Sequence, residues 1–159
     1  MRDLTNHNHS RRGGATVGQI ADLTPVEAAS VLYLRMWGEG ENGIRQIEHD
    51  FTTSLGTSDG QAAFWAFESL CQNCAIYGRR PLMRHQLRCN CLGADESCFA
   101  NLIGAAGEGA REDAALMASL IVRPDLALPL ADLAQQVAIA FQRLIDAAPE
   151  VTPKDTTLH

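Results

Sequence analysis

Apolar residues recur three or four positions apart through most of this chain, and glycine or proline separates the segments that they form. This spacing is typical of amphipathic helices, because it places the apolar side chains on one helix face. Aromatic residues make up only 6% of the sequence and β-branched residues are few, which also favours helix over sheet. The sequence therefore predicts an all-α fold.

About five helices are expected. The clearest start is the capping box formed by Thr24 and Glu27, with Pro25 at the first helical position. In order, the expected helices run over about residues 25–37, from Ile44 to a stop at Gly56, from a capping box at Ser58 to Gly78, from a cap at Asp95 to just before Pro124, and from Leu130 to just before Pro149. The glycines of the fourth helix indicate a close contact, a bend, or a break into two helices near Gly107.

A chain of 159 residues has the usual size of one domain, and no internal repeat or domain boundary is visible. Residues 1–21 are polar and interrupted by glycine, so they are predicted to form a flexible tail; residues 149–159 are predicted to form another. The predicted domain, residues 22–148, is a single bundle of about five helices. A long loop rich in cysteine and arginine, residues 79–94, joins its third and fourth helices.

Charge and hydropathy exclude several functional classes. The formal net charge of −6 argues against general nucleic-acid binding, which depends on neutralising phosphates. No run approaches the length of a membrane span, and the first residues lack the apolar segment of a secretory signal. A cytoplasmic location is therefore expected, where disulfides are rare and five cysteines need another explanation.

All five cysteines lie within residues 71–98. Cys71 and Cys74 are three apart on an expected helix, where they either bind a metal together or pack in the core. Cys89 and Cys91 lie in the polar loop, where no apolar stripe explains them. Four thiolates suit tetrahedral zinc, so Cys71, Cys74, Cys89 and Cys91 are predicted to hold a structural zinc ion. Cys98 and His85 are alternate ligands, and an iron–sulfur cluster ranks below zinc.

A redox reaction is the alternative use of the same thiols. Cys89, Cys91 and Cys98 are its candidate residues: a thiol of lowered pKa near Arg88 reacts, and a second thiol closes a reversible disulfide. Cys98 is expected in the first turn of a helix, where the helix dipole would lower its pKa.

Four arginines surround these cysteines, and they are predicted to contact an anion or an acidic protein partner. They are Arg79, Arg80, Arg84 and Arg88. The hydrolase elbow G-x-S-x-G and the phosphate loop G-x-x-x-x-G-K-S/T are both absent. The sequence thus favours a regulatory or protein-binding module over an enzyme, with self-association through apolar helix faces; a thiol redox sensor or oxidoreductase is the alternative.

Overall fold

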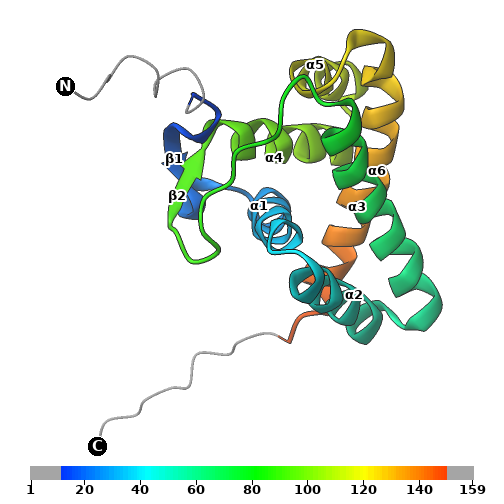
Figure 1. Cartoon of the computed structure of the whole chain (residues 1–159). Helices are drawn as coiled ribbons and strands as arrows, with labels where there is room; N and C mark the ends of the chain where they lie inside the picture. The colour runs from blue at the N-terminus through cyan, green and yellow to red at the C-terminus, as the bar shows by residue number, and fades with distance from the viewer. Residues whose placement is uncertain (1–11, 150–159) are drawn as a thin grey trace, which may run out of the picture.

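The computed structural model describes residues 12–149, and these form six helices and a small two-stranded sheet (Figure 1). The all-α prediction is confirmed, with six helices in the described residues rather than five. In chain order the elements are β1 Thr16–Gln19, α1 Pro25–Gly38, α2 Glu41–Leu55, α3 Thr57–Tyr77, β2 Cys91–Gly93, α4 Ala94–Gly107, α5 Arg111–Ile121 and α6 Ala127–Ala147.

The additional helix arises from a break in the expected fourth helix. α4 ends at Gly107, and Gly109 adopts a φ of 78°, a left-handed conformation that is strained for residues with a Cβ. The chain then turns back as α5, which packs against α4 and α6. Of the three roles that the sequence left open for these glycines, a break near Gly107 is confirmed.

The helix starts agree with the sequence only in part. The Thr24 capping box of α1 is confirmed, since Thr24 Oγ1 accepts from the Glu27 N–H at 3.3 Å and the Glu27 carboxylate accepts from the Thr24 N–H at 3.3 Å. The cap at Ser58 is wrong, because α3 starts after Gly56, whose φ is 89°. The cap at Asp95 is also wrong, because Gly93 is the N-cap of α4. The Asp95 carboxylate pairs with Arg80 instead.

α6 is the centre of the bundle and contacts each of the other five helices within the described residues. Four aromatic rings form the middle of the core, with centroid distances between 5.4 and 6.3 Å for the closest pairs. They come from four different helices and are Tyr33, Phe51, Phe67 and Phe141. The aromatic centre of the core therefore comes from helices alone.

Replacing Phe141 by alanine should lower the free energy of unfolding by about 3–5 kcal/mol, because it leaves a cavity among three other aromatic rings. Ile139 is the matched control, since it lies on the same helix and is 56% exposed. Ile139→Ala should change the stability little. Urea denaturation measures both values, and equal losses for the two variants would contradict this description of the core.

The structure differs from the predicted N-terminal tail at residues 12–21. β1 pairs with β2 in antiparallel register, with Gln19 opposite Cys91. Gly13 is buried against an ion pair between Arg80 and Asp95, where a Cβ would lie 2.1 Å from the Asp95 carboxylate. A glycine interpreted as a sign of flexibility is thus needed for close packing. The rest of the predicted N-terminal tail, residues 1–11, and most of the C-terminal one, residues 150–159, lie outside the described residues.

The small sheet and the loop before it lie at one side of the bundle, next to the start of α4 (Figure 1). No helix in the described part of the chain has the length and hydropathy required to cross a lipid bilayer. The long loop between α3 and α4 is present as expected, and its last residues form β2.

Candidate functional site

Arg35 of α1 holds the cysteine-bearing loop in place. Its guanidinium donates to the Glu96 carboxylate at 2.6 and 3.0 Å. It also donates to the backbone oxygens of Gln86 at 3.1 Å, Cys89 at 2.7 Å and Cys91 at 2.7 Å. These five hydrogen bonds use all five N–H groups of the guanidinium. One buried cation therefore fixes three loop carbonyls that would otherwise need water or a metal.

Glu96 completes this anchor from the first turn of α4. It is fully buried and also accepts from the N–H groups of Gly93 at 3.0 Å and His85 at 3.3 Å. Burial opposes ionisation of this carboxyl, but the hydrogen bonds from Arg35, Gly93 and His85 and the charge of Arg35 outweigh it. They hold the pKa of Glu96 below its ordinary value of 4.5. The stability that Glu96 contributes is thus fully present above pH 4.5 and is lost as the pH falls through its lowered pKa.

Arg35→Met should destabilise the protein by about 3–5 kcal/mol, because it leaves the Glu96 carboxylate buried without its counter-charge. The double variant Arg35→Met/Glu96→Leu should recover part of this loss, since no unpaired charge remains. Arg45→Gln, which breaks the exposed pair with Glu41 on α2, is the control and should have little effect. Urea denaturation gives the three values. A single variant as stable as the wild type would contradict the role of the pair.

A second carboxylate, Asp95, holds the start of the loop. Arg80 donates to both of its oxygens at 2.6 Å, and the Met83 N–H donates to it at 2.7 Å. Asp95 is 5% exposed, whereas the Arg80 side chain is 53% exposed. The two adjacent acids of α4 therefore anchor both halves of the loop.

The anchored loop brings a thiol next to an imidazole. His85 Nε2 lies 2.7 Å from the Gly14 carbonyl oxygen, and His85 Nδ1 lies 3.7 Å from Cys89 Sγ. A carbonyl oxygen can only accept, so Nε2 carries a hydrogen and Nδ1 of the neutral ring is left to accept from the thiol. The imidazole of His85 thus contacts the Cys89 thiol on one side and the Gly14 carbonyl, which orients it, on the other. A thiol next to an oriented base is the arrangement that activates a nucleophile.

The electrostatics of this pair favour the thiolate form. The backbone N–H of Cys91 and the imidazole of His85 lower the pKa of Cys89 below its ordinary value of 9.0, with a further contribution from the Cys91 thiol. The contact with Cys89 and the Gly14 carbonyl raise the pKa of His85 above 6.5. Cys89 and Cys91 are both partly exposed, so small reagents can reach them.

The other cysteines lie in different environments. Cys71 and Cys74 are 1% and 2% exposed in the helical core, and burial raises the pKa of Cys71 and that of Cys74, the latter to about 12. The expectation for Cys98 is wrong: burial, followed by the charge of Asp95, raises its pKa instead of lowering it. Its lowered pKa and partial exposure make Cys89 the favoured reactive thiol.

The structure does not bring the predicted zinc ligands together. Cys71 and Cys74 belong to the core cluster, whereas Cys89 and Cys91 lie in the loop and at the start of β2. Within residues 12–149, no three His, Cys, Asp or Glu side chains are arranged to hold a metal ion. Binding of zinc or of an iron–sulfur cluster stays a prediction from the sequence, and the loop is held by Arg35, Asp95 and Glu96 through hydrogen bonds of their own.

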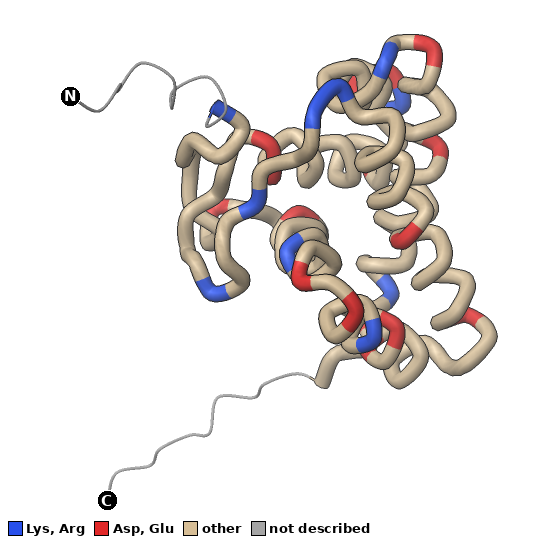
Figure 2. The backbone as a smooth tube through the Cα atoms, in the orientation of Figure 1, with Lys and Arg blue, Asp and Glu red and all other residues tan. Residues whose placement is uncertain are grey.

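The four loop arginines are not equivalent. Figure 2 shows basic positions spread along the loop between α3 and β2. Arg80 is bound to Asp95, and Arg79 donates to the Ser119 carbonyl at 3.1 Å. Arg84 and Arg88 are exposed and form no ion pair with a described carboxylate. Among the four loop arginines, these two form no hydrogen bond or ion pair with the described residues and remain available to an anionic ligand.

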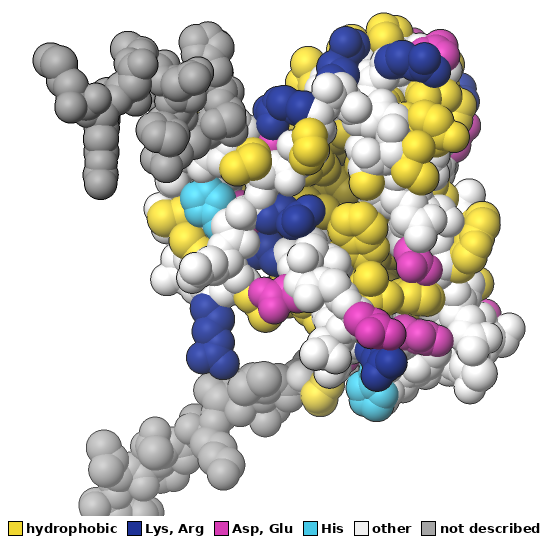
Figure 3. Space-filling model, in the orientation of Figure 1, with side chains coloured by type: hydrophobic (Ala, Val, Ile, Leu, Met, Phe, Trp, Pro, Cys, Tyr) yellow, Lys and Arg dark blue, Asp and Glu magenta, His cyan; other side chains and the backbone are white. Residues whose placement is uncertain are grey.

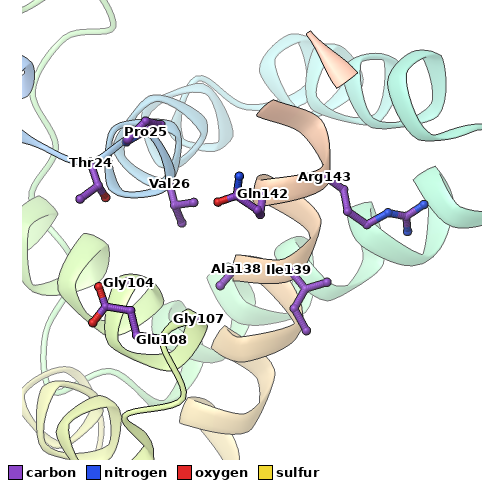
Figure 4. A pocket seen from close by; sticks show the side chains of 10 residues that line it. All are labelled: Thr24, Pro25, Val26, Gly104, Gly107, Glu108, Ala138, Ile139, Gln142 and Arg143. Atoms are coloured by element: carbon purple, nitrogen blue, oxygen red, sulfur yellow. The ribbon is translucent and has the colours of Figure 1, made fainter. Parts of the chain in front are cut away.

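A separate hollow of about 390 Å³ lies between the start of α1, the end of α4 and α6 (Figure 4). Its walls include Val26, Gly104, Gly107 and Ile139. The side chain of Arg143 points away from it, towards Asp59, to which it donates at 3.0 Å. No cysteine or histidine is among the residues that line this hollow.

Comparison with protein-family models, with curated proteins and with solved structures found no match to this chain. Sequence reasoning missed the two residues at the centre of the loop anchor, Arg35 and Glu96. Arg35 did leave a signal, because it follows Val31 by four residues and so lies on the apolar face of α1.

Thiol labelling under native conditions should modify Cys89 first and should spare Cys71 and Cys74 until the protein unfolds. The reason is exposure together with the lowered pKa of Cys89. Mass spectrometry of peptides after brief treatment with iodoacetamide measures the order. Early labelling of Cys71 or Cys74 in folded protein would contradict their burial.

Proposed function

We propose that this protein is a thiol-based redox sensor or oxidoreductase in which Cys89 reacts with an oxidant and Cys91 then closes a reversible disulfide. The observation that carries the proposal is the contact of Cys89 Sγ with His85 Nδ1 at 3.7 Å, with His85 oriented by the Gly14 carbonyl. The Cys91 thiol beside it favours a dithiol reaction over a hydrolase, which would have no use for a second thiol.

The reaction with a peroxide balances in two steps. The Cys89 thiolate attacks one peroxide oxygen, the O–O bond breaks, and the product is Cys89 sulfenic acid with hydroxide as the leaving group. The Cys91 sulfur then attacks Cys89 Sγ and expels the sulfenic oxygen, which leaves as water after protonation, so that a Cys89–Cys91 disulfide forms. His85 holds a proton next to the reacting sulfur in both steps.

The position of Cys89 and Cys91 next to the small sheet supports a regulatory role, in which oxidation changes the local structure. Cys91 is opposite Gln19 in the small sheet, and the Ile20 N–H donates to the Asn90 carbonyl between the two cysteines at 2.9 Å. A disulfide across Asn90 would therefore strain the pairing of β1 with β2. Binding of an acidic partner and self-association stay predictions from the sequence.

Treatment with hydrogen peroxide should remove two free thiols per chain and link Cys89 to Cys91. The Cys91→Ser variant should stop at the sulfenic acid, which dimedone traps on Cys89. Cys98→Ser is the matched control and should still form the disulfide. Peptide mass spectrometry gives the products, and metal content is measured on the same untreated sample. One bound zinc per chain with Cys89 and Cys91 protected would overturn the redox proposal.

The rate of Cys89 alkylation by iodoacetamide should rise with pH along a titration curve whose midpoint lies below 9.0, because only the thiolate reacts. His85→Ala should move this midpoint upwards and slow the reaction at neutral pH, since the imidazole no longer favours the thiolate. His49→Ala, an exposed histidine on α2, is the control. An unchanged midpoint in His85→Ala would show that the imidazole does not activate the thiol.

A further inference from the structure

Cys89 lines two hollows in the surface of the loop. One, of about 460 Å³, is also lined by Arg84 and His85. The other, of about 340 Å³, is lined by Arg88 and again by Cys89. No aspartate or glutamate is among the residues that line either hollow. Cys89 therefore borders two hollows, and each of them is also lined by an exposed arginine.

Arg79 is bound to a backbone carbonyl and Arg80 to a carboxylate, so Arg84 and Arg88 are the two loop arginines whose side chains form no hydrogen bond or ion pair with the described residues. The Arg84 side chain crosses the end of α1, where a Cβ on Gly38 would lie 2.2 Å from its Nε. The guanidinium of Arg84 thus lies against Gly38, and the residue as a whole remains exposed. Arginine side chains spread over the face that carries the loop in the space-filling view, together with a histidine (Figure 3).

The two exposed arginines beside Cys89 favour a reagent with negative charge. A ligand that places a sulfur at Cys89 and reaches into both hollows needs its sulfur in the middle and an anionic group on each side. A tripeptide thiol with a central cysteine and a carboxylate at each end has this arrangement. Guanidinium groups suit such carboxylates, because they bind the two oxygens with a planar fork.

We propose that Cys89 reacts with the disulfide of a small peptide thiol that carries a carboxylate on each side of its sulfur, of the glutathione type, and that Arg84 and Arg88 bind the two carboxylates. This inference rests on the proposed function, in which Cys89 is the nucleophile, and it adds the substrate class.

The exchange needs no further reagent. The Cys89 thiolate attacks one sulfur of the small disulfide, the original S–S bond breaks, and one small thiolate leaves while the other half stays on Cys89 as a mixed disulfide. The Cys91 thiolate then attacks Cys89 Sγ and releases the second small thiolate. The protein dithiol is oxidised by two electrons and the small disulfide is reduced to two thiols.

The test compares an anionic disulfide with a neutral one. Full-length protein carrying Cys91→Ser, which retains the mixed disulfide, is treated with oxidised glutathione or with 2-hydroxyethyl disulfide, and mass spectrometry follows modification of Cys89. Arg84→Gln and Arg88→Gln are each added to this background. Arg45→Gln, on α2, removes the same charge from a site outside both hollows and is the control.

Arg84→Gln and Arg88→Gln should each slow the reaction with oxidised glutathione by about three- to tenfold. The rate of reaction with the neutral disulfide should stay within about twofold of its value without these substitutions. Added salt should slow the glutathione reaction alone. Equal losses with both disulfides, or the same loss in Arg45→Gln, would overturn the inference while leaving the proposed function intact. No reaction of Cys89 with either disulfide would overturn the proposed function and the inference with it.

Discussion

The structure around the loop depends on one buried guanidinium. Arg35 donates to the Glu96 carboxylate and to three backbone carbonyls of the segment that contains Cys89 and Cys91. Of the loop residues 79–90, Leu82 and Leu87 pack against the core and both are only partly buried, so apolar packing holds this segment less firmly than it holds the helices. The buried guanidinium, with all of its hydrogen bonds made, holds the loop backbone in place. Breaking the Arg35–Glu96 pair is costly, because either partner alone would be a buried, unpaired charge.

The anchor also determines the chemistry at the surface. Because Arg35 binds the carbonyls of both Cys89 and Cys91, the backbone on each side of Asn90 is fixed. Glu96 binds the backbone N–H of His85, whose imidazole lies beside Cys89. The same interaction that stabilises the loop therefore also holds the backbone of the residues that take part in the proposed reaction.

Sequence reasoning predicted the all-α fold from local signals, and these account for the Thr24 capping box and for a break near Gly107 as one of three alternatives. It predicted the importance of Cys89 and Cys91 for a similar reason, since no apolar pattern explained them. It could not predict the Arg35–Glu96 pair, whose partners are 61 residues apart and meet only when α1 packs on α4. Proximity of thiols in the sequence was likewise no guide to their proximity in space, because the bundle buries Cys71 and Cys74 and leaves the loop pair outside.

The most direct test is a carbon-13 NMR titration of the Cys89 Cβ in cysteine-labelled wild-type protein and in Arg35→Met/Glu96→Leu. If the buried pair positions the thiol, Cys89 titrates with a pKa below 9.0 in the wild type and moves towards that ordinary value in the double variant, while the helical core stays folded. The same titration curve in both proteins would contradict the account, because the state of the thiol would then be independent of the anchor.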